Sequence, residues 1–594
     1  MPGRSRRNRR SPGSAGAWPR GRALVALTAF CLTAAVLLAG RVETAAPAGV
    51  EPGLDIRLGF DGIVKVGVPM PLEVGVPALP QGGRAELIVA APALGPQAGT
   101  VVVSTVVPFD AVAGAPREFD IPIVLSDIRR ALVIRLRIAG RDVARKAVTI
   151  DPARVGGRVV VAVGAEPLDL TLLGRLPGRV TSGSILPETL PRRWQEYAPI
   201  DLLVVHDLDE ARVDDAQREA LLTWVRLGGR LLVAPRPGGV APRFLDPVLP
   251  AAVRSPLVAA APAGRGWVTL WAFDPARRPR SARPGRLALW ADALGTPARP
   301  LVDVAAAAAH LPRSTPLDPV AHAEVGLAIL LYVILLFGVG RRYPTGPGAA
   351  ACLALVAVGV AGFAGLASDV RGRATTLAQV TFLELAPRTG LARALTVAAV
   401  AVPYGGPFDL HTADSVVAAP VDASGDVRIE RAARAGVLTA RIRQGEDARA
   451  VYAIGTAQAR ASGWLMDDGR GLTVDLGGDS LRHAELWWRG RTYPLGDLPA
   501  GVSALRLWPD QWGRPPETDG DDRVWAWIFR GEGSDVLMDA GGPLLVGETG
   551  HPASAFSLAG GETMGRHLTV LLVSLLPQPP TDLRDGPGTP KTRP

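Results

Sequence analysis

Residues 200–234 read IDLLVVHDLDEARVDDAQREALLTWVRLGGRLLVA and carry the strongest fold signal in the chain. The first seven of these residues are almost all apolar and predict a buried strand. Asp214 then offers an N-cap, Gln217 completes a capping box, and the helix that follows ends at Gly228, which suits a left-handed C-terminal cap. A second apolar strand, RLLVA, begins at once. Uninterrupted apolar strands on either side of a helix indicate a parallel sheet covered on both faces.

The same alternation begins further upstream, because residues 158–164 form another apolar strand, RVVVAVG. Residues 157–300 are therefore predicted to form an α/β doubly wound (flavodoxin-like) domain. Ligands of such domains bind at the carboxyl ends of the strands.

Residues 201–239 resemble class I glutamine-amidotransferase-like (ThuA-like) domains, in which an aliphatic strand and an acidic turn precede a helix ending in "W…GG.L". Bacterial multi-domain membrane proteins of unassigned function combine such a domain with a β-sandwich and several transmembrane helices. This chain is similar to them over most of its length, including residues 481–501. An active amidotransferase places a cysteine on a sharp turn after a strand, with His and Glu beside it. This chain has PRPGG at 235–239, so the resemblance implies a degenerate, catalytically silent domain.

The cysteine count limits the chemistry further. The only cysteines of the chain are Cys31 and Cys352, and both lie inside long apolar segments. The sequence therefore excludes a disulfide framework or a thiolate metal site in the remaining regions.

The basic residues are concentrated rather than spread. The 594 residues carry 65 Lys and Arg against 56 Asp and Glu, and seven of the arginines lie within residues 1–22. Without these and the pair Arg341 and Arg342, the two charge types are equal in number. A nucleic-acid partner requires basic residues clustered on a folded face, so none is predicted, and the excess beside apolar runs indicates a membrane.

Three apolar segments, 23–40, 325–340 and 348–368, are predicted to be transmembrane helices. The first could instead be a cleaved signal peptide, and the other two could form a buried hairpin. The positive-inside rule makes residues 1–22 a cytoplasmic tail and leaves the large domains outside the cytoplasm. A further apolar run at 568–576 is too short to span a bilayer and is predicted to be a buried strand, with a fourth membrane helix as the alternative.

Two other regions show strand patterns. Residues 50–152 contain short alternating strands, of which LVIRLRI at 132–138 is the clearest, and are predicted to form a β-sandwich. Residues 375–578 form a β-rich region with seven tryptophans, and residues 579–594 are predicted to be a disordered tail. Trp525 and Trp527 fall on one face of a strand, where they could stack on sugar rings. The alternative is that such tryptophans fill the core.

The candidate catalytic residues are His206, Asp207 and Asp209, because they follow a predicted parallel strand at its carboxyl end. A histidine with two nearby carboxylates could orient a water molecule or hold a metal ion. The competing interpretation is that both aspartates are turn formers before a helix. No pair of histidines has the spacing that places both on one helical face, so neither a metal site nor a cofactor is predicted.

Together these patterns predict a multi-domain membrane protein with an α/β doubly wound domain, two mainly-β sandwich-like regions and three transmembrane helices. We expect a non-enzymatic bacterial inner-membrane protein with extracytoplasmic binding or scaffolding domains, or an accessory part of an envelope transport or assembly complex. Its expected partners are membrane lipid and other envelope proteins. One alternative is an envelope hydrolase or amidotransferase-like enzyme using His206, Asp207 and Asp209, and another is a cell-wall glycan-binding protein.

Overall fold

The computed structural model describes residues 53–235 except 95–99, most of 241–311, residues 375–513 with short gaps, and parts of 543–575; between 312 and 374 it describes only a few positions. The chain divides into two compact units, Met1–Glu51 and Pro52–Pro594, and all described residues belong to the second. The predicted segments at 1–22 and 23–40, the tail at 579–594, and both Trp525 and Trp527 lie outside the described residues.

The first region, after residue 53, consists of two facing sheets. One sheet has the order β1-β2-β5, and strands β3, β4, β6 and β7 belong to the other. Side chains such as Leu72, Leu87 and Ile121 fill the core between them and are at most 2% exposed. The alternation predicted for 132–138 is confirmed by β6. The strands are β1 (Asp55–Leu58), β2 (Pro69–Val76), β3 (Gly83–Leu94), β4 (Thr100–Ala111), β5 (Arg117–Val124), β6 (Leu132–Ile138) and β7 (Arg141–Val148), and the turn η1 (Pro152–Arg154) follows.

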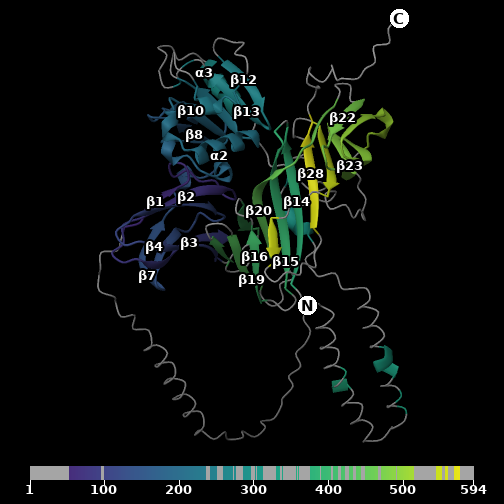
Figure 1. The fold of residues 1–594 in the computed structure, drawn as a ribbon, viewed down its shortest axis with the longest axis horizontal. Coiled ribbons are helices and arrows are strands. Elements are labelled where there is room, and N and C mark those ends of the chain that lie inside the picture. Colours follow the sequence, from purple (N-terminus) through teal and green to yellow (C-terminus); the bar gives the residue numbers. More distant parts are fainter. Residues whose placement is uncertain are drawn as a thin grey trace, which may run out of the picture. The chain divides into compact units, whose positions relative to one another are not determined.

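The second sheet of this region continues into strands from the far end of the sequence. Its eight strands have the order β27-β16-β19-β18-β4-β3-β6-β7, and β18 pairs with β4 in parallel, with Val427 opposite Val103. Figure 1 shows this mixture as dark blue and green strands in one sheet. The added strands are β16 (Gly406–Thr412), β18 (Val427–Arg431), β19 (Gly436–Ile442) and β27 (Phe556–Leu558).

A six-stranded sheet with the order β12-β13-β11-β10-β8-β9 follows in the sequence. All neighbouring pairs are parallel except β12 and β13. One face packs against α2 and the other against α3 through Trp290. The strands are β8 (Arg158–Val163), β9 (Val180–Ile185), β10 (Leu202–His206), β11 (Arg230–Ala234), β12 (Val258–Ala263) and β13 (Gly266–Trp271). The helices are α2 (Asp215–Arg226) and α3 (Gly285–Leu294), and the 3-10 turns are η2 (Thr171–Arg175), η3 (Pro187–Thr189), η4 (Trp194–Tyr197), η5 (Glu210–Arg212) and η6 (Arg243–Leu245).

The start of α2 is the capping box that the sequence predicts. The Asp214 side chain accepts a hydrogen bond from the Gln217 backbone nitrogen (2.8 Å), and the Gln217 side chain accepts one from the Asp214 nitrogen (2.9 Å). Burial alone would raise the pKa of Asp214, but the hydrogen bonds from Gln217 and Arg192 outweigh it and leave that pKa below 3.8.

Replacing Asp214 with alanine is expected to cost about 1 kcal/mol of the free energy of unfolding, because the Gln217 backbone nitrogen at the start of the helix loses its acceptor. Since the folded-state pKa is lowered, this contribution is present above the ordinary value of 3.8 and disappears as the pH falls through the folded-state value. Urea denaturation at neutral and acid pH measures both effects. Asp215, which is 98% exposed and pairs with Arg218 on the surface, is the control. A loss in Asp215→Ala equal to that in Asp214→Ala would contradict the role of the cap.

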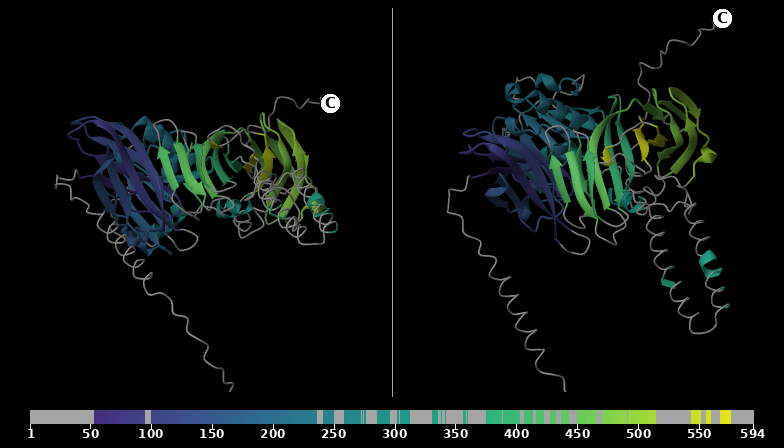
Figure 2. Two further views of the ribbon diagram at one scale, coloured as in Figure 1. Left: turned by 90° about the horizontal axis from the view of Figure 1, so that it is seen from below. Right: turned by 60° about the horizontal axis from the view of Figure 1, so that its bottom comes forward.

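The last region is built on a second eight-stranded sheet, with the order β17-β20-β15-β14-β28-β26-β23-β24, and a small sheet β21-β22-β25. Figure 2 shows its strands in green and yellow. The run predicted at 568–576 as a buried strand is confirmed by β28, which pairs in parallel with β14. The strands are β14 (Thr376–Ala386), β15 (Leu391–Ala401), β17 (Val417–Pro420), β20 (Arg449–Gln458), β21 (Ser462–Leu465), β22 (Gly471–Asp475), β23 (Leu481–Trp488), β24 (Arg491–Leu498), β25 (Val502–Arg506), β26 (Leu544–Thr549) and β28 (His567–Ser574), with α4 (Val304–His310) against the sheet and the turn η7 (Pro509–Gln511).

The doubly wound, flavodoxin-like domain predicted for 157–300 is wrong. Such a domain places a helix in each crossover between parallel strands. Here, α2 is the one α-helix in the described crossovers, and 3-10 turns serve the others. The part of the chain that the structure describes is mainly β, which also contradicts an α/β amidotransferase-like domain.

The membrane prediction is contradicted as well. Among the described residues, no helix combines the length and the apolar character that a bilayer crossing needs. The 12-residue α2 is about 18 Å long, against a hydrocarbon core of about 30 Å. Most of 325–340 and 348–368 lies outside the described residues. The finding on the described helices contradicts the predictions of three transmembrane helices, a multi-pass inner-membrane location and extracytoplasmic domains.

Candidate functional site

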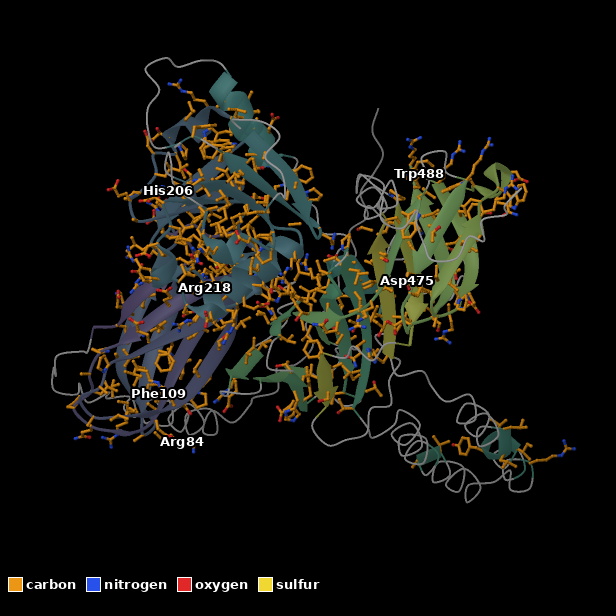
Figure 3. The ribbon with its side chains drawn as sticks, turned by 45° about the horizontal axis from the view of Figure 1, so that its top comes forward. Arg84, Phe109, His206, Arg218, Asp475 and Trp488 are labelled. Carbon is orange, nitrogen blue, oxygen red and sulfur yellow. The ribbon has the colours of Figure 1, made fainter. Side chains whose placement is uncertain are left out.

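The carboxyl end of the parallel sheet holds the three residues that the sequence nominates. His206 ends β10, and its side chain is 5% exposed. Gly164, just after β8, is close enough that a Cβ there would lie 2.7 Å from the His206 Nε2 atom. The imidazole is thus packed tightly against the neighbouring strand end, and Figure 3 shows His206 in this part of the chain.

The two aspartates take backbone roles beside it. Asp209 accepts a hydrogen bond from the Ala211 backbone nitrogen (3.0 Å) and so caps η5. Asp207 has φ of 46°, in the left-handed region that aspartate tolerates at turns. Within the described residues, no group of three His, Cys, Asp or Glu side chains is arranged to hold a metal ion. His206, Asp207 and Asp209 thus lie together at this end of the sheet, but the Asp209 carboxylate binds the backbone of its own turn.

A different set of charged residues meets at the amino end of the same sheet. Four neighbouring strands, in the order β13-β11-β10-β8, each begin with or directly follow a charged residue. In that order these residues are Arg265, Arg230, Asp201 and Arg158. Because the four strands are parallel, their amino ends lie at one edge of the sheet. The four charged residues therefore lie side by side at that edge.

Asp201 is the acidic centre of this edge. Its Oδ2 atom accepts hydrogen bonds from the Lys65 ammonium (3.0 Å) and from the Val159 backbone nitrogen (2.8 Å). The Asp201 side chain is 13% exposed, so the ion pair with Lys65 is partly shielded from water. This contact also links the first region of the chain to the parallel sheet.

The two flanking arginines are partly buried. The Arg158 guanidinium donates from Nη2 to the carbonyl oxygens of Leu294 (2.5 Å) and Gly295 (2.6 Å). Burial lowers the pKa of Arg158, the Asp201 carboxylate opposes that effect, and the nearby Arg230 charge lowers the pKa further. Burial likewise lowers the pKa of Arg230, against the influence of Asp201. For both arginines, the nearby Asp201 carboxylate offsets only part of the effect of burial on the charged guanidinium group.

The third region contributes a buried carboxylate. Glu384 on β14 is 2% exposed, and its Oε2 atom lies 2.6 Å from Arg265 Nη1 and 3.7 Å from Arg393 Nη1. Both arginines are themselves at most 27% exposed. A carboxylate buried this deeply requires paired cations, because an isolated buried charge is very costly.

These residues surround a cavity of about 330 Å³, which we call the amino-edge pocket. Its charged lining comprises Lys65, Arg158, Asp201, Arg230, Arg265, Glu384 and Arg393. Trp194 and Trp224 contribute aromatic surface. The pocket thus has five cationic and two anionic side chains, contributed by all three regions described above, and can attract a negatively charged group.

The comparisons with known proteins do not identify a family. No family model matches the chain, and no curated protein matches it. Among solved structures the chain is similar to DesR, a β-glucosidase from Streptomyces venezuelae in complex with D-glucose, at 11% identity and a TM-score of 0.10. The match covers 76% of this chain and 47% of that chain, so this chain spans about half the length of DesR. A similarity this weak carries no argument.

Proposed function

We propose that the chain is a non-enzymatic binding protein whose ligand occupies the amino-edge pocket. The observation that carries the proposal is the convergence of seven charged side chains from three regions on one cavity of about 330 Å³. Cavities of this size typically hold small molecules, with a few polar groups fixing the orientation of the ligand. A cavity with this many charged groups selects its ligand mainly by charge.

The connections between the regions support a scaffolding role for the rest of the chain. The parallel pairing of β18 with β4 and the Arg265–Glu384 ion pair hold the contributing segments together. Sites are most precise when rigid elements support the residues that bind. We therefore propose that the sheets position the pocket walls, and the binding of partner proteins stays a prediction.

The two alternatives from the sequence have less support. An enzyme that uses His206, Asp207 and Asp209 would need the Asp209 carboxylate for chemistry, whereas that carboxylate caps η5. For glycan binding, Trp525 and Trp527 lie outside the described residues, and of the other tryptophans Trp487 is buried while Trp508 is 49% exposed. The glycan hypothesis therefore stays a prediction for Trp525 and Trp527 alone.

Filling the pocket is expected to abolish ligand binding. Ala198 lines the pocket and is exposed, so Ala198→Trp introduces an indole without disturbing a core. The full chain is screened by thermal unfolding against phosphate esters, polycarboxylates, polyamines and neutral sugars. A ligand present at a hundred times its Kd stabilises the native state by about 2.7 kcal/mol, which raises Tm measurably.

The matched control is Ala115→Trp, at an exposed alanine of the first region that does not line the pocket. We expect a ligand that raises the Tm of the wild type and of Ala115→Trp but leaves Ala198→Trp unchanged. If no member of the panel shifts the wild type, or if the shift persists in Ala198→Trp, the proposed function is wrong.

A further inference from the structure

The charges of the amino-edge pocket do not balance. Both carboxylates are already engaged, Asp201 with Lys65 and with the Val159 nitrogen, and Glu384 with Arg265. Five cationic side chains therefore face two carboxylates whose acceptor atoms are partly used. A pocket for a neutral ligand would not need this excess of positive charge. Cationic side chains that lie close together in a partly buried site repel one another, and a bound anion would compensate that repulsion.

Hydrogen-bond donors also remain unused. The Nε atoms of Arg158 and Arg393 are buried and make no hydrogen bond to any residue that the structure describes. A buried donor without an acceptor is costly, because it has given up its hydrogen bonds to water without replacing them. Arginine carries five donors in a planar fork, which suits bidentate contacts with oxyanions. The pocket thus offers guanidinium groups, whose positive charge and fork of donors suit the oxygens of a phosphate group.

The distribution of the arginines over several strands favours a tetrahedral anion. Arg158, Arg230 and Arg265 stand at the amino ends of β8, β11 and β13 of the parallel sheet, and Arg393 lies on β15 of the last region. A phosphate group has three terminal oxygens that point in different directions and can accept from guanidinium groups on several sides. A single planar carboxylate can serve fewer of them at once.

We propose that the amino-edge pocket binds a small organic phosphate, with the phosphate or pyrophosphate group held by Arg230 together with Arg158 and Arg393. This inference rests on the proposed function and names the chemical class of its ligand. The volume of about 330 Å³ suits a small ester rather than a polymer. Trp194, which is half-buried in the wall, provides an apolar surface for the organic part.

The site lies at the opposite edge of the sheet from the one where parallel α/β sheets usually bind ligands. Those ligands bind beyond the carboxyl ends of the strands, where this chain packs His206 against Gly164. The amino ends are available here because segments of the first and last regions bring Lys65, Glu384 and Arg393 to them. The extra regions thus complete a site that the parallel sheet alone does not contain.

Isothermal titration calorimetry of the full chain with pyrophosphate and with inorganic phosphate tests the inference. Arg230 is the residue to change, because it lines the pocket at the start of β11, whereas the Arg158 guanidinium also donates to the Leu294 and Gly295 carbonyls. We expect Arg230→Gln to weaken pyrophosphate binding at least about tenfold, which corresponds to about 1.4 kcal/mol. Arg230→Lys keeps the charge and is expected to retain part of the affinity.

The control is Arg84→Gln, at an exposed arginine of the first region that lies outside the pocket (Figure 3). It should bind pyrophosphate as tightly as the wild type. Because the contacts are ionic, raising the salt concentration should weaken binding to the wild type more than to Arg230→Gln. Circular dichroism and the Tm of each variant establish that it is folded.

Three outcomes would overturn the inference. They are the absence of binding to either phosphate at millimolar concentration, equal affinity in Arg230→Gln and the wild type, and binding of citrate in preference to both phosphates. A neutral or cationic ligand that stabilises the wild type but not Ala198→Trp would refute the organic phosphate while leaving the proposed binding function intact. The two proposals can therefore fail separately.

Discussion

Replacing Arg265 with alanine is expected to lower the free energy of unfolding by about 3 kcal/mol. The reason is the position of its partner, since Glu384 is 2% exposed and lies 2.6 Å from Arg265 Nη1. Removing the cation leaves a buried carboxylate whose distance to the Arg393 Nη1 atom is 3.7 Å. The Glu384 carboxylate then loses its 2.6 Å ion pair while its side chain stays almost fully buried. Urea denaturation followed by tryptophan fluorescence measures the loss.

An exposed pair of the same residue types provides the control. Arg57 Nη1 lies 2.9 Å from Glu73 Oε2, but the two side chains are 53% and 33% exposed. Water screens such a pair, so Arg57→Ala should cost at most about 1 kcal/mol. The double variant Arg265→Met with Glu384→Met should recover much of the stability, because no charge is left buried. Equal losses in Arg265→Ala and Arg57→Ala would show that Glu384 does not depend on Arg265.

Local signals in the sequence predicted local structure well. The capping box of Asp214 and Gln217 and the alternation in 132–138 correspond to α2 and β6. The apolar run at 568–576 corresponds to β28. In each case residues close together in the sequence carry the whole signal. In the capping box a side chain reaches a backbone nitrogen three positions away, and in a strand apolar and polar side chains alternate with a period of two.

The pairing of distant strands could not be predicted. β4 and β18 are separated by more than three hundred residues, and the apolar pattern of each strand fits many partners. The prediction of a doubly wound domain failed for a related reason. Apolar strands imply that something covers both faces of the sheet, but they do not say that α-helices do so, and here 3-10 turns serve most of the crossovers that the structure describes.

The location of the candidate site was missed although its signal is in the sequence. Arg158, Asp201 and Arg230 each stand at the start of an apolar strand that the sequence identifies. His206 was nominated because it lies at the carboxyl end of a strand. Parallel strands also bring their amino ends together, and the charged residues of the pocket lie there. Lys65, Glu384 and Arg393 could not be added to that group, because only the tertiary structure brings the other two regions to this edge.

The second large effect is expected at Gly266, the first residue of β13. A Cβ at this position would overlap the backbone carbonyl oxygens of Val225 and Gly229, at the end of α2 and just before β11. Backbone atoms in a packed sheet cannot turn aside as a flexible side chain can, so the whole turn must move. Gly266→Ala should therefore lower the free energy of unfolding by about 3 kcal/mol, at the upper end of the cost of overpacking.

The same substitution should also weaken the binding of pyrophosphate, because this turn positions Arg265. The Arg265 backbone nitrogen donates to the Arg226 carbonyl (2.8 Å), and the Trp267 nitrogen donates to the Gly229 carbonyl (3.1 Å). Gly174→Ala is the matched control, since a Cβ there meets nothing within 4 Å and the residue is exposed. It should change neither property. If Gly266→Ala is as stable as Gly174→Ala, the close approach between α2 and β13 does not exist, and the wall that holds Arg265 at the amino-edge pocket must be built differently.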